Sequence, residues 1–329
     1  MPPETPFRSI QTTEDLLERF RAGERQLEGI NLKEAQLQGV DLSGSELMAA
    51  FLSHGDLRRC QLLAVNLFGA NLSHSDLTEA NLSQADLRDV DFHGACLART
   101  ILLQSDLRGS NLNGSDLRGA ILENANLRYA SIRGSYLEGA NLRQALLEGA
   151  NLWETDLSNA DLTQASLVEA RLCGVQMAKA RLDQADLSRA KMWGAKLRES
   201  SFYQAQLQGA SLSGANLWAA CLREADLSFV EMSEADLMSA DLGLARLCGS
   251  HLRGSDLSAA ELEQADLQGA NLEDVSLGGA NLEGANLCGT ILLGTNLQLA
   301  QLRDALYDAD TQFPEGFDPA EAGMTVAAA

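Results

Sequence analysis

Histidines are the first candidates for acid, base or metal chemistry, and the chain has only four of them. His54 and His74 are twenty residues apart, and His93 follows nineteen residues later. If twenty residues returned the chain over itself, the first two imidazoles would stack ~4.8 Å apart and could share a divalent metal. Because chance ladders are common in repeats, we interpret the stack as structural and predict no metal ion and no cofactor.

Cysteines are the second candidates, and all six are far apart in the chain. They are Cys60, Cys96, Cys173, Cys221, Cys248 and Cys288. No two have the close spacing of a metal-binding motif. We interpret them as free thiols in a reducing compartment, which predicts a cytoplasmic protein.

Carboxylates are abundant, but their distribution does not indicate catalysis. The 46 Asp and Glu outnumber the 25 Lys and Arg, for a formal net charge of -21. Such a charge repels nucleic acid and anionic membranes, and it can attract a basic protein surface. The Asp residues recur regularly without an evident cleft to desolvate them, and Gly recurs as a turn residue rather than in a phosphate-binding loop. We predict a protein that is not an enzyme, with no catalytic residues.

Two further absences concern membranes and export. No stretch approaches the ~18 consecutive apolar residues of a membrane-spanning helix. Residues 1–10 have neither the basic nor the apolar segment of a secretory signal. We therefore expect no membrane contact.

A repeat of five residues must position all these side chains. From Leu27 to Leu302 every fifth residue is Leu over 56 successive positions, except Phe92, Ile132, Met177, Met192, Phe202 and Met232. From Leu32 onward a small or apolar residue lies two positions before each of these residues, and Asp or Asn often lies one position before. A period of five fits neither a helix nor a flat strand. It predicts one short straight edge and one turn per repeat, with the central Leu and the small residue pointing inward.

Recurring glutamines indicate how many edges close one coil. Seven glutamines are separated from one another by multiples of twenty residues and share one repeat position, and Asn124 occupies the position between Gln104 and Gln144. They are Gln84, Gln104, Gln144, Gln164, Gln184, Gln204 and Gln264. Side chains stacked in register can hydrogen-bond as a ladder. The spacing predicts a four-sided coil of twenty residues, and about 14 such coils in residues 27–306.

This A(D/N)LXX pattern resembles the pentapeptide-repeat family. The resemblance covers residues 27–306 and implies an all-β fold, a right-handed quadrilateral parallel β-helix. The flanking segments, residues 16–25 and 313–319, are similar to those of bacterial, especially cyanobacterial, members. The resemblance also implies action through protein contacts, as in a regulator of heterocyst differentiation.

The ends of such a solenoid need covers, because they expose apolar core and unpaired edges. Residues 1–26 are predicted to carry a short capping helix that begins at Thr12 or Thr13 and ends at Gly23. Leu16, Leu17 and Phe20 would form its apolar face.

Residues 307–329 are predicted to form a coiled lid followed by a frayed tail from residue 320. Tyr307, Phe313 and Phe317 are the large apolar side chains of this segment. Pro314 and Pro319 disfavour regular structure there.

Tryptophan and arginine side chains mark the predicted partner-binding site. Trp153 and Trp193 occupy outward positions of one face, two coils apart, with Cys173 between them. Exposed Trp beside Arg is typical of interaction hot spots, although aromatic stacking on neighbouring coils is the alternative interpretation. The predicted residues are Trp153, Trp193, Trp218 on the adjacent face, Arg133 in the column of Trp153, and the flanking Arg171 and Lys191.

Charge is uneven along the repeats. Counting Lys, Arg, Asp and Glu gives -5 for residues 27–102, zero for 103–202 and -10 for 203–302. A basic collar in the middle is either solvated surface, a docking site for an acidic partner, or a surface for self-association: Arg171, Lys179, Arg181, Arg189, Lys191, Lys196 and Arg198. An outward apolar strip could also seat a partner: Leu63, Ile101, Leu103 and Ile121.

Three functions follow from these surfaces. The first is a rigid non-enzymatic scaffold or regulatory protein, a monomer or end-to-end dimer with an unknown protein partner. The second, implied by the quinolone-resistance members of the family, is an acidic DNA mimic that inhibits or protects DNA gyrase or topoisomerase IV. The basic collar and the uninterrupted repeat register weigh against the mimic. The third is a purely mechanical spacer without a specific partner.

Overall fold

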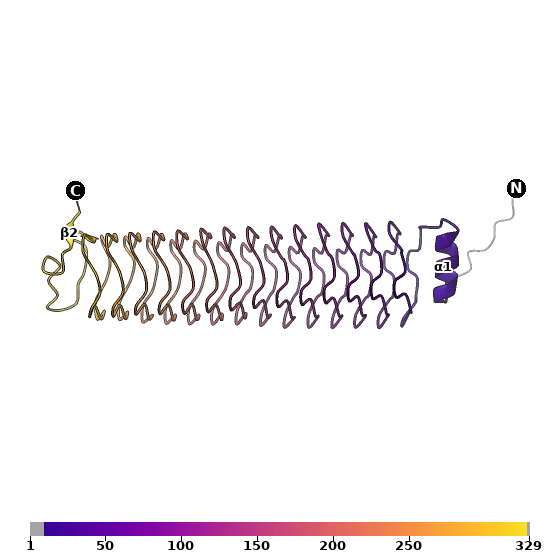
Figure 1. The fold of residues 1–329 in the computed structure, drawn as a ribbon, viewed down its shortest axis with the longest axis horizontal. Helices are drawn as coiled ribbons and strands as arrows, with labels where there is room; N and C mark the ends of the chain where they lie inside the picture. Colours follow the sequence, from indigo (N-terminus) through magenta and orange to yellow (C-terminus); the bar gives the residue numbers. More distant parts are fainter. Residues whose placement is uncertain (1–9, 328–329) are drawn as a thin grey trace. The chain divides into compact units, whose positions relative to one another are not determined.

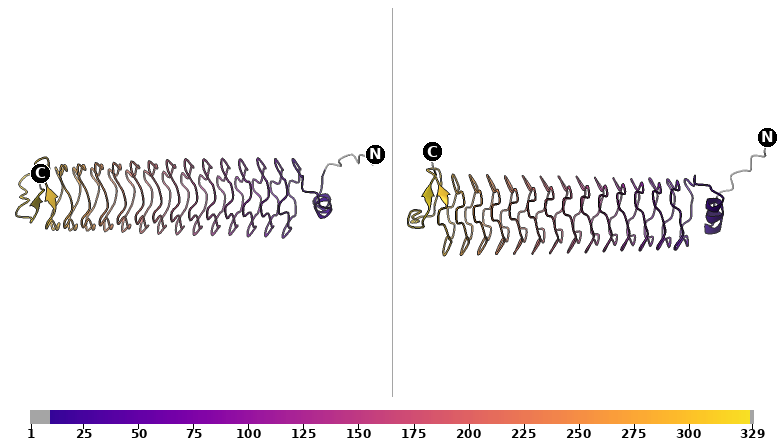
Figure 2. Two further views of the ribbon diagram at one scale, coloured as in Figure 1. Left: turned by 90° about the horizontal axis from the view of Figure 1, so that it is seen from above. Right: turned by 45° about the horizontal axis from the view of Figure 1, so that its top comes forward.

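The computed structural model describes residues 10–327, which belong to two compact units, Met1–Leu146 and Leu147–Ala329. Within each unit the backbone winds as a stack of similar coils (Figure 1 and Figure 2). The helix and strands of the described residues are α1 (Thr13–Arg21), β1 (Leu306–Tyr307) and β2 (Thr325–Val326). The expectations for residues 1–9, including most of the segment searched for a secretory signal, lie outside the described residues.

Parallel backbone bridges join residues that are twenty apart in both units. Asn31 bridges Phe51 in the first unit, and Asn151 bridges Arg171 in the second. Around the first of these, the Leu32 N–H donates to the Phe51 carbonyl at 2.9 Å. Four repeats of five residues therefore complete one coil, which confirms the four-sided coil predicted from the glutamine spacing.

The predicted glutamine ladder forms within each unit. In the second unit the Gln164 side chain donates to Gln184 at 2.8 Å, and Gln184 donates to Gln204 at 3.1 Å. In the first unit Gln84 donates to Gln104 at 3.4 Å. Each amide both donates and accepts, so identical side chains can satisfy one another coil after coil.

Each side of a coil is shorter than a conventional strand. One residue per repeat bridges to the neighbouring coils, the central residue follows, and two residues turn the chain. The turn begins before a second residue can pair. The all-β core is thus built from isolated parallel bridges. In the part of the chain that the structure describes, only β1 and β2 form a two-residue ladder, with Leu306 opposite Thr325.

Central leucines and the small residues two positions before them fill the interior of each unit, as predicted. Leu157 is fully buried, and so are the larger Phe92 and Phe202 at the same repeat position. Several inward serines keep a hydrogen bond, as when the Ser45 hydroxyl donates to the Leu42 carbonyl at 2.6 Å, although the Ser110 and Ser250 hydroxyls have no partner among residues 10–327. A buried hydroxyl without a partner would be costly, so this bond lets Ser replace Ala in the core.

The second turn residue of each repeat has a backbone conformation that the sequence did not predict. Its φ is positive throughout the repeats, from 52° at Ala49 to 71° at Gly294. The turn is closed by a hydrogen bond such as the one from Ala35 N–H to the Leu32 carbonyl at 3.1 Å. This is the pattern of a type II turn, which favours Gly. Many repeats nevertheless place other residues here, at a cost of ~1–2 kcal/mol each.

This strain makes Ala259→Gly a stabilising substitution. Ala259 is an exposed turn residue with a φ of 56°. Relief of ~1–2 kcal/mol of strain outweighs the ~0.5–1 kcal/mol of extra backbone entropy that Gly loses on folding. We expect the midpoint of urea unfolding to rise. The neighbouring Ala260→Gly is the control. Ala260 is fully buried, so removing its methyl group should lower the midpoint of urea unfolding. A fall in both midpoints would contradict the strain argument.

Helix α1 lies beside the first coil of the first unit (Figure 1). Thr12 is its N-cap, and the Thr12 hydroxyl accepts from the Asp15 N–H at 3.1 Å. Leu16 is fully buried, whereas Phe20 is partly exposed beneath the Arg25 guanidinium, which lies 3.8 Å from the ring centroid. That α1 stabilises the solenoid as a cap stays a prediction.

The repeat register ends near the C-terminus. Ile291 bridges Gln312, twenty-one residues later. The predicted aromatic cluster forms, since the Tyr307 and Phe313 rings meet edge to face with centroids 5.6 Å apart and Phe313 stacks on Phe317 at 5.2 Å. That this segment acts as a lid stays a prediction.

The tail is more ordered than expected. We predicted fraying from residue 320, but β2 pairs with β1 and Met324 is buried. Unpaired backbone groups at the end of a solenoid need partners, and Thr325 supplies one by donating its N–H to the Ala305 carbonyl at 2.9 Å. Residues 328 and 329 lie outside the described residues.

Candidate interaction surfaces

Trp153 and Trp193 lie on one face of the second unit, as predicted. Both are exposed, Trp153 by 40% and Trp193 by 52%. Cys173 lies between them in the same column, since the Glu154 N–H donates to the Cys173 carbonyl and the Gly174 N–H donates to the Trp193 carbonyl, each at 3.1 Å. Cys173 itself is buried, so the two exposed indoles flank a recessed position of the column.

The cations of the basic collar divide into two groups. Three are paired with carboxylates on adjacent coils: Lys179 with Glu199 at 3.6 Å, Arg181 with Asp161 at 3.7 Å and Arg189 with Glu169 at 3.5 Å. The other group has no carboxylate within 4.0 Å among residues 10–327, and it consists of Arg171, Lys191, Lys196 and Arg198.

This division could have been read from the sequence. Each paired cation has an acidic residue twenty positions away, whereas Arg171 and Lys191 have Asn151 and Ser211 as their outer neighbours in the column. Arg171 and Lys191 bridge each other on adjacent coils, and both are exposed. The uncompensated charges of Arg171 and Lys191 therefore lie on the face that carries Trp153 and Trp193, whereas Lys196 and Arg198 lie on the face of Trp218.

Trp218 belongs to the neighbouring face and is only partly exposed. The Arg198 guanidinium lies 4.5 Å from its ring centroid, a cation–π contact. The indole thus packs against Arg198 of the adjacent coil, and that Trp218 belongs to a partner-binding site stays a prediction. Trp218 is thus separated from the Trp153 and Trp193 pair.

Arg133 belongs to the first unit, whereas the other predicted site residues belong to the second. Its backbone N–H donates to the Asn113 side-chain oxygen at 2.8 Å. Four of the predicted site residues lie together on one face of the second unit: Trp153, Trp193, Arg171 and Lys191.

The predicted histidine stack is present in the first unit. The His54 and His74 rings are nearly parallel with centroids 5.1 Å apart, and His93 meets His74 edge-on at 5.3 Å. A side chain at Gly94 would clash with the His74 ring, so this glycine makes room for it. Among residues 10–327, no three His, Cys, Asp or Glu side chains gather in a group that could hold a metal ion.

The thiols of Cys60 and Cys248 are poor nucleophiles at neutral pH. Burial raises the pKa of Cys60 to about 11. Burial and a hydrogen bond from its thiol to Asp266 raise the pKa of Cys248 to about 11. Because the thiolate is the reactive form, these residues suit packing better than covalent chemistry.

The apolar strip of the first unit is partly exposed. Leu63 and Leu103 have 43% and 36% of their surface exposed. Ile101 and Ile121 bridge each other on adjacent coils and are partly buried.

In the portion of the chain that the structure covers, no helix has the length and apolar character needed to cross a membrane.

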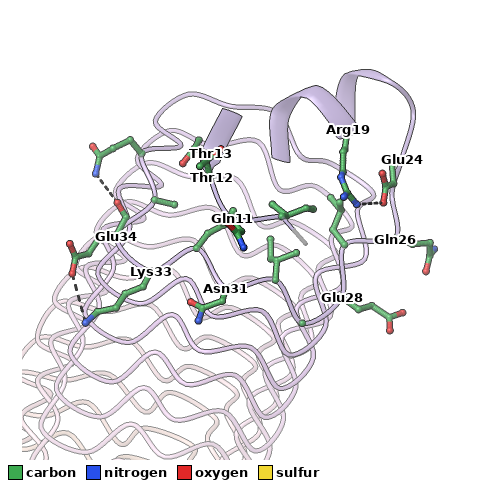
Figure 3. A pocket seen from close by; sticks show the side chains of 17 residues that line it. Gln11, Thr12, Thr13, Arg19, Glu24, Gln26, Glu28, Asn31, Lys33 and Glu34 are labelled. Carbon is green, nitrogen blue, oxygen red and sulfur yellow. Dashed lines mark hydrogen bonds and ion pairs between the residues drawn. The ribbon is translucent and has the colours of Figure 1, made fainter. Parts of the chain in front are cut away.

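A groove between α1 and the first coil is a feature that sequence reasoning missed. It has a volume of about 810 Å³, and Figure 3 shows the Arg19–Glu24 pair on one side and the Lys33–Glu34 pair on the other. Pairing of these charges within the walls leaves little net charge toward the groove. The repeat pattern carried no signal for it, because α1 precedes the repeats.

The sequence profile described as Pentapeptide repeats matches most of the chain. The matched segments are residues 26–62, 66–103, 105–144, 140–177, 165–204, 180–218, 200–238, 240–279 and 270–306. No curated protein matches the chain.

Among solved structures, the chain is 29% identical to HetL, a pentapeptide-repeat protein involved in heterocyst differentiation regulation in Nostoc sp. PCC 7120, over 92% of this chain and 99% of that one, with a TM-score of 0.24. It is 41% identical to alr5209 of Nostoc over 34% and 84% of the chains, with a TM-score of 0.17. It is 17% identical to QnrB1, a plasmid-mediated fluoroquinolone resistance protein, over 68% and 91%, with a TM-score of 0.34.

These TM-scores are too low to support an argument from superposition. The assignment depends instead on the profile, which covers residues 26–306 almost without a gap, and on the bridges between residues twenty apart. Pentapeptide-repeat proteins form right-handed quadrilateral β-helices, and such bridges agree with that fold. The chain belongs to the pentapeptide-repeat family.

Proposed function

We propose that the protein is a non-enzymatic scaffold or regulatory protein that acts through protein contacts on its flat faces. The observation that carries this proposal is the face bearing Trp153 and Trp193, with Arg171 and Lys191 beside them and no carboxylate within 4.0 Å of either cation among residues 10–327. Exposed indoles next to uncompensated cations suit an acidic protein surface that also offers apolar side chains.

The solenoid supports this proposal by holding the four side chains in fixed positions. Each belongs to a repeat whose central residue, such as Leu152 or Leu172, is fully buried. A preorganised surface loses little conformational entropy on binding. The six free cysteines further support a reducing compartment such as the cytoplasm.

The double substitution Trp153→Ala and Trp193→Ala tests this function. Hot-spot truncations cost ~2 kcal/mol or more each, so we expect capture of the partner from native lysate to fall by well over tenfold. The measurement is quantitative mass spectrometry of proteins retained on the immobilised chain.

Phe229→Ala is the matched control, because Phe229 is an exposed aromatic residue of the same unit, 68% exposed and on a different repeat position. The control should retain the partner. An unchanged set of captured proteins with the double variant would remove Trp153 and Trp193 from the function.

A DNA mimic is the second candidate, and the acidic part of the second unit favours it. Asp236 bridges Asp256, and Asp241 bridges Glu261, so carboxylates that are at least partly exposed follow one another on adjacent coils. Arg223, at 3.6 Å from Asp241, neutralises part of this surface. Uncompensated cations such as Lys191, within the same unit, would repel the basic DNA-binding surface of a topoisomerase.

We expect no inhibition of DNA gyrase supercoiling at micromolar concentrations of this protein. Within the first unit, acidic side chains are also locally compensated, as in the pairs Asp106–Arg108 at 2.6 Å and Asp116–Arg118 at 2.5 Å. Supercoiling of relaxed plasmid, followed on agarose gels over a range of salt concentrations, gives the answer. Salt-sensitive inhibition would favour the mimic over the scaffold.

A further inference from the structure

The last coil of the second unit has one side that no residue among 10–327 covers. In inner coils each side is paired with the next, as when the Leu277 N–H donates to the Asn296 carbonyl and the Gly279 N–H donates to the Gln298 carbonyl, both at 2.9 Å. The C-terminal segment continues this pairing on three sides of the last coil. Its donor and acceptor pairs are Leu287 N–H to Leu306 at 2.8 Å, Leu292 N–H to Gln312 at 2.7 Å and Asp304 N–H to Gly323 at 2.9 Å.

The fourth side, residues 295–299, presents an open backbone edge. The N–H groups of Leu297 and Leu299 have no acceptor among residues 10–327, and the Thr295 carbonyl has no donor there. In inner coils the equivalent groups are the ones that bind the following coil. This edge therefore offers two donors and one acceptor in the geometry that the solenoid itself uses for parallel pairing.

Apolar side chains accompany the open edge. Leu299 is 89% exposed, Leu293 is 43% exposed, and Leu297 is partly exposed although other central leucines, such as Leu292, are buried. An extended segment added here would satisfy the backbone groups and cover these leucines together.

Charge decides which kind of segment fits. Residues 284–302 contain no charged side chain, and the C-terminal segment that follows is acidic, with Arg303 as the one cation against Asp304, Asp308, Asp310, Glu315, Asp318 and Glu321. Arg303 is paired with Glu283. A second copy of this chain, with a formal net charge of -21, would be repelled by this segment.

We propose that residues 295–299 bind an extended, basic and apolar peptide segment of another protein by strand addition. The segment lies parallel to residues 295–299, accepts hydrogen bonds from the Leu297 and Leu299 N–H groups, and donates one to the Thr295 carbonyl. Its apolar side chains cover Leu297 and Leu299, and its cations face the carboxylates of residues 304–321. This surface is separate from the face of Trp153 and Trp193.

A labelled synthetic peptide of alternating valine and lysine is the probe, and Leu299→Lys is the test variant of the full chain. Leu299 is almost fully exposed, with a φ of 61°, so this substitution should leave the fold intact. We expect fluorescence anisotropy to show at least tenfold weaker binding, because the variant loses an apolar contact and gains a repelling charge. Hydrogen exchange of the Leu297 and Leu299 amides in the wild-type chain should slow when the peptide is saturating.

Leu244→Lys is the matched control, since Leu244 is also an exposed turn leucine, with a φ of 59°, and its substitution changes the net charge equally. Binding should be unchanged in this control. Equal weakening by both variants, or unprotected amides at Leu297 and Leu299, would overturn the proposal. A concentration-dependent dimer that Leu299→Lys abolishes would assign the edge to a second copy instead and would also overturn it.

Discussion

Replacing Leu157 with Asp should unfold the second unit under conditions in which the wild-type chain is folded. Leu157 is fully buried in the inner column, and its N–H donates to the Gln176 carbonyl at 2.7 Å, so it lies within the ladder between two coils. A buried Leu→Ala substitution costs ~2–5 kcal/mol. A carboxylate at this position costs more, because it has no partner in an apolar interior.

Asn159→Asp is the control for this experiment. Asn159 is an exposed turn residue two positions further, with a φ of 59°, and its substitution adds the same negative charge. Surface changes of this kind are usually within ~0.5 kcal/mol. Circular dichroism during urea unfolding separates the two variants, and equal unfolding midpoints would show that residue 157 does not face the interior.

Phe202→Ala should produce the second largest loss of stability. Phe202 is a fully buried central residue that replaces the usual Leu, and its N–H donates to the Cys221 carbonyl at 2.7 Å. Removing the ring leaves a cavity between closely stacked coils, which costs ~3–5 kcal/mol. Stability in a solenoid depends on contacts between neighbouring coils, so the loss should appear first in the coils on either side of this position.

Phe202→Leu is the informative companion variant. It restores the residue found at most central positions, and a swap between large apolar residues usually costs less than ~1.5 kcal/mol. Hydrogen exchange by mass spectrometry would show whether protection is lost only near residue 202. If Phe202→Leu were as harmful as Phe202→Ala, the site would require an aromatic ring rather than apolar volume.

Much of the fold could be predicted because one short pattern is repeated without insertion. The central Leu, the small residue before it and the glutamines at multiples of twenty defined the four sides, and the bridges between residues twenty apart agree with them. The same rule placed Trp153 and Trp193 on one face and stacked His54 on His74.

The turn conformation could not be predicted in the same way. Gly recurs in the turns of the sequence, but residues as different as Arg59, Tyr129 and Phe229 also adopt a positive φ at the second turn residue. Local preference disfavours this conformation for them. Backbone pairing with the adjacent coils imposes it, and that pairing exists only in the assembled solenoid.

The sequence by itself determined which residues share a column, because a constant period turns position in the chain into position on a face. Only the tertiary structure decided what happens where that period stops. It placed β2 against β1, opened a groove beside α1 and left residues 295–299 without a covering segment. At the ends each residue has a neighbour on one side only, so its partners depend on how non-repeating segments pack, and no spacing in the sequence encodes that.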